Sequence, residues 1–147
     1  AMRTFSKSYS LAGLRVGYCV GPRDLIRAMY KVKDSYNVDA LAQTVALAAI
    51  RDQDWMRKNA AKVIRSRTRL SAALEKRGWD VLPSEANFVF ARPPAPAKAA
   101  DIFTRLRERN IFVRYFPGPK TGDSLRVTVG TEPEMKTLLK ALDELTS

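Results

Sequence analysis

The stretch RTFSKSYSLAGLRVGY, residues 3–18, sets a lysine and an arginine close together among small and apolar residues. Ser6 stands directly before Lys7, and Arg15 follows the lysine by eight positions. Burial or neighbouring positive charge lowers the pKa of a lysine amine and activates it toward carbonyl carbons. A guanidinium fork matches the oxygens of a phosphate, and a serine hydroxyl supplies a further donor. An amine beside such donors is the set of groups that holds pyridoxal phosphate.

A lysine and an arginine by themselves are more often a surface amine and an ordinary ion-pairing residue than a cofactor site. The whole string around them is what indicates a cofactor loop. RTFSKSYSLAGLRVGY closely resembles the Schiff-base lysine signature of the fold-type I pyridoxal-phosphate aminotransferases. The resemblance implies that Lys7 forms the Schiff base and moves protons on the cofactor. It also implies that Ser6 and Arg15 hold the cofactor phosphate.

Further segments carry the same resemblance toward the C-terminus. SYNVDALAQ (35–43), EANFVFAR (85–92) and IFVRYF (111–116) followed by DSLRVTVGTEPEM are similar to segments of histidinol-phosphate aminotransferases. The resemblance implies that Arg126 binds the substrate α-carboxylate and that Arg114 binds the substrate phosphate. Asn37 is expected near the amino-acid carboxylate, and Asn87 is expected to help position the active site. Both are weaker candidates, since both could be turn or capping residues.

Two departures from the family pattern bear on activity. The family usually has proline before the tyrosine and asparagine, whereas this chain has Asp34-Ser35 before Tyr36-Asn37. Family members also carry more than half of their chain before the lysine. That part supplies the aspartate at the cofactor's ring nitrogen and a tyrosine from a neighbouring subunit. We therefore expect a C-terminal portion whose partner is the missing N-terminal region, in a homodimer, and no activity of this portion alone.

Composition sets further bounds. The chain has 147 residues, 46% hydrophobic and 28% charged, which suits one ordinary soluble domain. It has one cysteine, Cys19, and no histidine, so an internal disulfide, a histidine-based triad and a histidine metal site are excluded. We expect no metal. No run is as long as the roughly 18 apolar residues that a membrane span needs, and no signal peptide is visible. We expect a cytoplasmic protein without a membrane partner.

The net charge of +11 could indicate nucleic acid as a partner. Residues 51–77 hold nine lysines and arginines against three acidic residues. Aromatic side chains are not interleaved with these charges, as stacking on bases would need. A solvated helix face is the better interpretation, and we expect no nucleic-acid binding. Arg67 is the exception, because it projects from the apolar side and must snorkel or meet a carboxylate.

Apolar patterning predicts an α/β chain with a compact two-layer α+β unit at its end. Gly78 and Asn110 are expected as left-handed helix stops, and Thr131 with Glu134 as a helix cap. The predicted elements are a buried strand at 14–20, helices at 23–33, 38–50 (buried) and 54–78, and the order β-β-α-β-β-α from residue 79.

These elements suggest three segments, which the resemblance places in the C-terminal part of a pyridoxal-phosphate-dependent transferase fold. Residues 1–37 are expected to be the tail of the large cofactor-binding domain. Residues 38–78 are expected to be linking helices, including a long inter-domain helix. Residues 79–147 are expected to be the small domain.

The resemblance implies a pyridoxal-phosphate-dependent aminotransferase that acts on small molecules. The expected reaction transfers an amino group between histidinol phosphate and 2-oxoglutarate in histidine biosynthesis. Related aromatic aminotransferases and threonine-phosphate decarboxylases remain alternatives, since a phosphate-directed Arg114 does not choose among them. A non-catalytic oligomerisation or regulatory module derived from the family is the alternative from another class.

Overall fold

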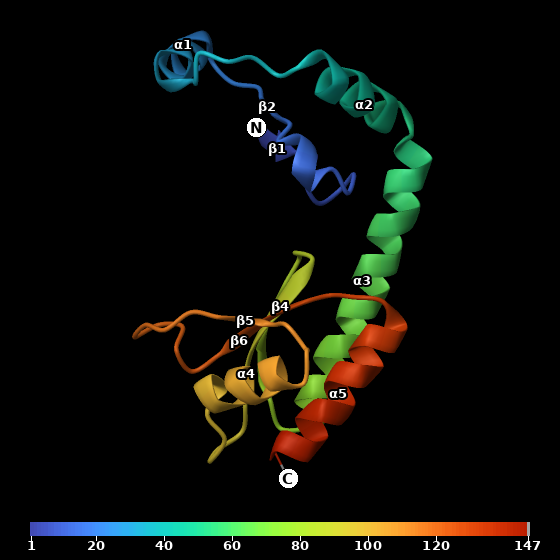
Figure 1. The fold of residues 1–147 in the computed structure, drawn as a ribbon, viewed down its shortest axis with the longest axis vertical. Coiled ribbons are helices and arrows are strands. Elements are labelled where there is room, and N and C mark those ends of the chain that lie inside the picture. Colours follow the sequence, from blue (N-terminus) through green and yellow to red (C-terminus); the bar gives the residue numbers. More distant parts are fainter. Residues whose placement is uncertain (147) are drawn as a thin grey trace. The chain divides into compact units, whose positions relative to one another are not determined.

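The computed structural model describes residues 1–146, which form two compact units (Figure 1). The first unit comprises residues 1–60 and the second begins at residue 61. Helix α3 (Gln53–Glu75) starts in the first unit and ends in the second. Among residues 1–146, no helix is both long and apolar enough to cross a lipid bilayer. The division at 1–37, 38–78 and 79–147 stays a prediction.

The first unit is built on a short antiparallel hairpin. Strand β1 (Met2–Thr4) pairs with β2 (Gly17–Cys19), with Met2 opposite Cys19 and Thr4 opposite Gly17. A Cβ atom at position 17 would lie 2.8 Å from the carbonyl oxygen of Arg3, so the close pairing requires glycine there. The other elements of this unit are the 3-10 turn η1 (Ala12–Leu14) and helices α1 (Arg23–Val32) and α2 (Ala40–Arg51).

Burial in the first unit differs from the expectation. The strand at 14–20 was expected to be buried, but Tyr18 is 47% exposed and no residue of β2 is buried. Helix α2 buries only Ala42 and Ala46, so the expectation of a buried helix is also wrong. The physical reason is size, because two strands of three residues cannot cover an apolar layer on either face.

The second unit has the predicted order β-β-α-β-β-α. Its four antiparallel strands lie in the order β3-β4-β6-β5. Strand β5 is short, because only Arg114 and Tyr115 pair with β6. The elements are β3 (Asp80–Leu82), β4 (Phe88–Arg92), α4 (Ala99–Glu108), β5 (Arg114–Tyr115), β6 (Leu125–Thr128) and α5 (Glu132–Thr146).

One face of this sheet forms the core and the other forms the candidate site. Alternate residues of β4 and β6 are buried in the core, where they meet apolar residues of α3, α4 and α5. The residues between them, Phe88, Phe90 and Arg126, are half-buried on the opposite face. The core-facing residues of the two strands are Val89, Ala91, Leu125 and Val127.

Two helices end in the same left-handed motif, as predicted. Gly78 has φ 78° after α3, and Asn110 has φ 59° after α4. The N–H of Trp79 donates to the Leu74 carbonyl at 3.1 Å, and the N–H of Gly78 donates to the Glu75 carbonyl at 2.9 Å. These two bonds are the Schellman pattern, and they turn Trp79, 3% exposed, back into the core.

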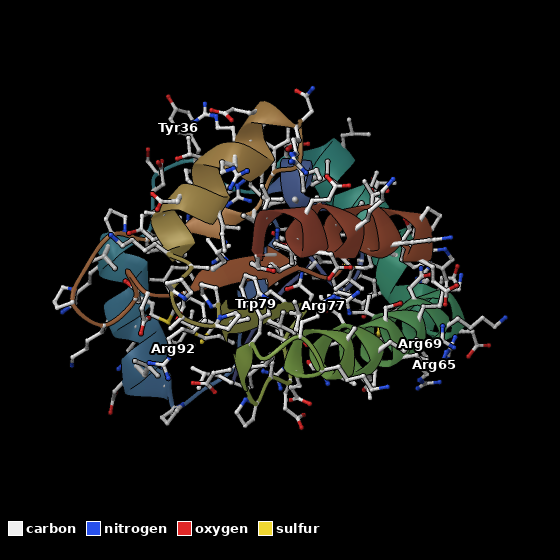
Figure 2. The ribbon with its side chains drawn as sticks, turned by 90° about the horizontal axis from the view of Figure 1, so that it is seen from below. Tyr36, Arg65, Arg69, Arg77, Trp79 and Arg92 are labelled. Carbon is white, nitrogen blue, oxygen red and sulfur yellow. The ribbon has the colours of Figure 1, made fainter. Side chains whose placement is uncertain are left out.

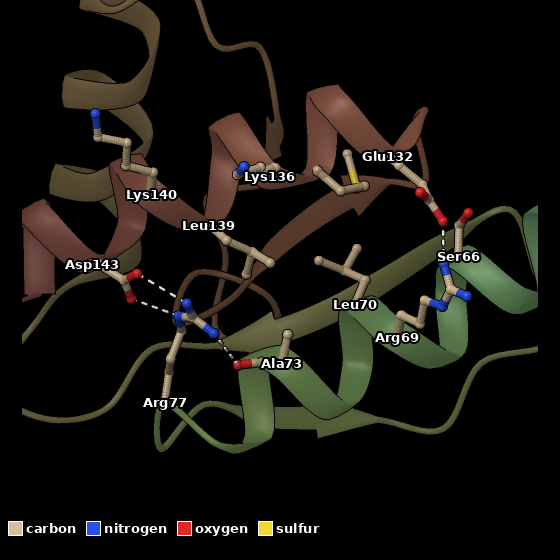
Figure 3. A pocket seen from close by; sticks show the side chains of 11 residues that line it. Ser66, Arg69, Leu70, Ala73, Arg77, Glu132, Lys136, Leu139, Lys140 and Asp143 are labelled. Atoms are coloured by element: carbon tan, nitrogen blue, oxygen red, sulfur yellow. Dashed lines mark hydrogen bonds and ion pairs between the residues drawn. The ribbon is translucent and has the colours of Figure 1, made fainter.

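Helix α3 packs against α5 through apolar residues and ion pairs (Figure 3). The guanidinium of Arg77 donates from Nε and Nη2 to the two carboxylate oxygens of Asp143, at 2.5 and 2.9 Å. Arg69 forms an ion pair with Glu132 at the other end of the groove. Leu70 lines the groove between these two ion pairs.

The basic side chains of α3 are exposed, as predicted; Arg65, labelled in Figure 2, is one of them. The contact that Arg67 makes differs from both expectations. Its Nη1 donates to the backbone carbonyl of Ala86 at 2.7 Å, so it neither snorkels nor meets a carboxylate. A backbone carbonyl just before β4 is a partner that sequence patterning cannot reveal.

Candidate active site

The β1–β2 hairpin brings Ser6, Lys7 and Arg15 to one end of its two strands. Beyond the last strand pair, the N–H of Phe5 donates to the Val16 carbonyl at 3.0 Å. Ser6 and Arg15 are the next residues on the two sides. Lys7 opens a turn that closes when the N–H of Ser10 donates to the Lys7 carbonyl at 3.2 Å. The backbone therefore gathers the three predicted cofactor residues in one loop.

Aromatic packing anchors this loop. Phe5 is only 5% exposed, and its ring stacks on Tyr9 with centroids 4.9 Å apart. The hydroxyl of Tyr9 accepts a hydrogen bond from Gln53 Nε2 at 3.0 Å. The two ends of the loop that carries exposed Lys7 are thus held by Phe5 and Tyr9. The Lys7 amine forms no hydrogen bond or ion pair with residues 1–146, which leaves it available for a carbonyl compound.

The hydroxyl of Ser6 is oriented by Thr4. Thr4 Oγ1 donates to Ser6 Oγ at 2.9 Å and accepts from the backbone N–H of Ser6 at 3.1 Å. Since Ser6 Oγ accepts from Thr4, its own proton remains free for an external acceptor such as a phosphate oxygen. The sequence did not single out Thr4. Its position two residues before a serine is a recognisable side-chain turn pattern that could have done so.

Arg15 is held in an unusual backbone conformation. Its φ is 53° and ψ is 38°, the left-handed region that costs a non-glycine residue about 1 kcal/mol. One guanidinium nitrogen, Nη1, donates to the Ala12 carbonyl at 2.9 Å. No carboxylate among residues 1–146 pairs with this arginine. The remaining N–H groups of its exposed fork are available for an anion.

Asn37 lies beside the same hairpin. A cavity of about 610 Å³ separates β2 from the end of α1 and the segment after it, and Asn37 lines this cavity together with Gly17 and Cys19. The neighbouring Tyr36 lines the same cavity, although its side chain is 85% exposed. The backbone N–H of Tyr36 donates to Asp34 Oδ1 at 3.0 Å. Asp34 thus stabilises the turn that carries Asn37.

The two arginines predicted to bind substrate lie together in the second unit. Arg114 of β5 and Arg126 of β6 are directly opposite one another in the strand register. The guanidinium carbon of Arg126 lies over the rings of Phe88 and Phe116, 5.2 and 5.1 Å from their centroids. The guanidinium carbon of Arg114 lies 5.3 Å from the Phe116 centroid. The sequence did not single out either phenylalanine.

This arrangement is electrostatically unbalanced. Like charges directly opposite in a sheet destabilise it, and neither arginine pairs with a carboxylate among residues 1–146. The Nε–H of Arg126 is also buried without a hydrogen-bond partner in the described part of the chain. Two unneutralised guanidinium groups on one sheet face form a candidate anion site. Asn87, a weaker candidate, accepts through its carbonyl from the Val129 N–H at 2.9 Å, a structural contact.

The predicted residues therefore fall into two groups, one in each unit. Ser6, Lys7, Arg15 and Asn37 surround the hairpin of the first unit, and Arg114 and Arg126 share one face of the second-unit sheet. Their convergence on one cleft stays a prediction. The first group fits pyridoxal phosphate chemically. The Lys7 amine, which has no partner among residues 1–146, suits the aldehyde, and the Ser6 hydroxyl with the N–H groups that Arg15 does not donate to Ala12 suits the phosphate.

Comparison with known proteins places these residues in context. The family model described as "Aminotransferase class I and II" matches residues 1–142. Histidinol-phosphate aminotransferase 2 of Rhizobium meliloti (strain 1021) is 50% identical over 98% of this chain and 42% of its own length. The histidinol-phosphate aminotransferase of Gluconacetobacter diazotrophicus is 49% identical over 96% of this chain and 40% of its own. The chain thus spans about two fifths of the relatives it matches.

A solved structure shows the same likeness. Histidinol-phosphate aminotransferase from Sinorhizobium meliloti, in complex with pyridoxal 5'-phosphate, has a TM-score of 0.86 to this chain at 30% identity. The match covers 99% of this chain and 40% of that one. The fold matches the C-terminal part of the fold-type I transferases, as predicted.

Proposed function

Since the chain belongs to the class I and II aminotransferases, a family that uses pyridoxal phosphate, we propose that it carries the lysine and substrate-anion half of a histidinol-phosphate:2-oxoglutarate aminotransferase. The observation that carries this proposal is the hairpin that gathers Ser6, Lys7 and Arg15 at one end. The pathway in which the enzyme works is then histidine biosynthesis, and the compartment is the cytoplasm.

The proposed mechanism assigns each group of the hairpin one task. The amine of Lys7 would hold the cofactor aldehyde. When free, it would take the proton from the amine-bearing carbon of the substrate and deliver it to the cofactor. Ser6 and Arg15 bind the cofactor phosphate. Thr4 keeps the serine proton directed outward, because it donates to Ser6 Oγ. When bound, the cofactor supplies an electron sink for that carbon.

Substrate binding is assigned to the second group. Arg126 and Arg114 present two unneutralised guanidinium groups, which suit the phosphate of histidinol phosphate and the carboxylates of 2-oxoglutarate. Asn37 approaches the amino-acid carboxylate. Both curated relatives described above carry the name histidinol-phosphate aminotransferase, which favours this substrate over an aromatic amino acid or threonine phosphate.

The rest of the enzyme is assigned to sequence outside this chain. Relatives are more than twice as long, and we propose that their additional region supplies the aspartate for the cofactor's ring nitrogen and part of a homodimer interface. The exposed apolar side chains of the first unit, among them Leu25, Tyr30 and Val32, suit burial against that region. The 147-residue chain alone is then inactive.

The test compares lysines in the full-length protein. Lys7→Ala should abolish the visible absorbance of the cofactor linkage and lower kcat for histidinol phosphate with 2-oxoglutarate by at least about 1000-fold. Lys31→Ala, an exposed lysine of α1, is the matched control and should keep both. Unchanged turnover in Lys7→Ala would overturn the assignment. A wild-type protein that binds no cofactor and forms a stable oligomer would support the non-catalytic module instead.

A further inference from the structure

The two substrate arginines are held by aromatic rings, and the ring that they share is Phe116. Its centroid lies 5.3 Å from the guanidinium carbon of Arg114 and 5.1 Å from that of Arg126. We propose that Phe116 is a positioning residue that fixes both guanidinium groups for substrate anions. The assignment of the anions as substrate rests on the proposed function, whereas the holding role of the ring rests on the geometry alone.

Rings hold a guanidinium differently from carboxylates. Arg92 donates to both Asp80 and Asp123, and Arg77 donates through two nitrogens to Asp143, so each of these forks is neutralised. A ring contacts the flat face of a guanidinium and leaves its in-plane N–H groups free. An arginine that must receive an anion therefore gains orientation from a ring without losing charge or donors.

Within residues 1–146, neither a carboxylate nor a hydrogen-bond acceptor orients Arg126. Its Nε–H is buried and unpartnered, and it pairs with no carboxylate among residues 1–146. The Phe88 ring lies 5.2 Å from its guanidinium carbon, close to the 5.1 Å of Phe116. The two rings are thus the groups that define where this charge lies. Because Arg114 is directly opposite in the register, the shared ring also sets its distance from Arg126.

Hydroxyl groups hold the backbone at both phenylalanines. Thr121 Oγ1 donates to the carbonyl of Phe116 at 2.8 Å, and Ser84 Oγ donates to the carbonyl of Phe88 at 2.6 Å. The turn that carries Thr121 is tight, since the N–H of Gly122 donates to the Gly118 carbonyl at 2.8 Å. Each ring therefore sits on a backbone position that a separate side chain holds.

Two readouts separate this role from simple packing. In the 147-residue chain, the binding of inorganic phosphate is measured by calorimetry. In the full-length enzyme, KM and kcat are measured for histidinol phosphate and for 2-oxoglutarate. Phe116→Leu should weaken phosphate binding and raise both KM values about five- to tenfold, as the loss of a cation–π contact to two cations predicts, with kcat within twofold.

Matched variants make the test specific. Phe116→Tyr retains the ring and should restore wild-type values within about twofold. Phe103→Leu is the packing control, because its half-buried ring lies 5.7 Å from that of Tyr115 and under no guanidinium. If Phe116→Leu does not fold, Phe88→Leu serves in its place. In a background that lacks both guanidinium groups, Arg114→Ala with Arg126→Ala, the ring change should alter phosphate binding by less than about twofold.

Each outcome decides the proposal. Phosphate binding and KM in Phe116→Leu equal to wild type, or a loss equal to that in Phe103→Leu, would overturn the positioning role. Absence of phosphate binding by the wild-type chain would overturn it as well. If the wild-type enzyme transaminates neither substrate but Phe116→Leu still weakens phosphate binding, the proposed function fails and the positioning role stands.

Discussion

Guanidinium groups are stabilised in two ways within the second unit. Arg77 is paired with Asp143. The hydrogen bond that its guanidinium donates is the main reason why the pKa of the Asp143 carboxyl lies below its usual value. Arg126 instead lies over two phenylalanine rings and pairs with no carboxylate among residues 1–146. The first arrangement fastens α3 to α5, whereas the second leaves a cation ready for a ligand.

Thr4 offers a residue-scale test of the cofactor loop. Thr4→Val removes the hydrogen bond to Ser6 Oγ and the acceptor for the Ser6 N–H. One lost hydrogen bond to a phosphate-binding hydroxyl should weaken the binding of pyridoxal phosphate to the full-length protein about fivefold. Thr4→Ser keeps the hydroxyl and is the control. An absorbance titration measures both, and equal affinities for the two variants would contradict the role of Thr4.

At the scale of elements, the end of α3 depends on glycine. Gly78 has φ 78°, and an added Cβ would meet only Pro94 at an ordinary 3.6 Å, so the cost of Gly78→Ala is backbone strain alone. The free energy of unfolding should fall by about 1 kcal/mol. Gly13→Ala, where an added Cβ meets nothing within 4 Å, should change it by less than about 0.5 kcal/mol. Urea unfolding measures both, and equal losses would exclude the strain.

The cap of α5 gives a pH-dependent prediction. The pKa of the Glu134 carboxyl lies below its usual value, chiefly because the backbone N–H of Thr131 donates to it and also because Thr131 Oγ1 donates. In the unfolded chain this carboxyl titrates at about 4.3. The unfolded chain therefore binds more protons between the two pKa values, and the cap's contribution is lost as pH falls through the folded pKa.

Glu134→Gln should therefore lower the free energy of unfolding at pH 7. Between pH 5 and 3 the free energy of unfolding of this variant should fall less steeply than that of the wild type, by the contribution of roughly one titrating group. Glu85→Gln, at an exposed carboxylate with no hydrogen bond to residues 1–146, is the matched control and should follow the wild-type slope. Urea unfolding across this range measures all three. A wild-type slope in Glu134→Gln would show that the cap does not form.

Elements of the second unit were predictable because their signals are local. Left-handed stops at Gly78 and Asn110 and the apolar stripe of α5 depend on residues a few positions apart. Partners across the fold were not predictable, as Arg67 with the Ala86 carbonyl and Arg126 with Phe116 show. In the first unit, apolar residues predicted burial for β2 and α2, but burial depends on what packs against an element and not on its composition.

At the scale of the whole molecule, the two units differ in how much they bury. Among residues 1–146, the first unit buries Phe5, Ala42 and Ala46, whereas the second contains a continuous core of large apolar side chains. Backbone amides with little burial around them exchange through frequent local opening. The stability of the 147-residue chain should therefore reside almost entirely in the second unit.

Native-state hydrogen exchange tests this difference. Amides of α1 should exchange at least about 100-fold faster than those of β4 and β6. In the full-length protein, the additional region that we propose packs against the first unit should slow amide exchange in α1. It should leave the exchange rates of β4 and β6 unchanged. Equal protection of α1 and β4 in the 147-residue chain would contradict the difference in burial.

The turn that carries Trp79 into the core has a practical consequence. The chain has two tryptophans, and each unit holds one of them: Trp79 at 3% exposure in the second and Trp55 at 44% in the first. An indole in a dry interior emits at shorter wavelength than one in water. A single fluorescence spectrum thus contains a separate optical signal for each half of the chain, and Trp55→Phe leaves a clean reporter of the core.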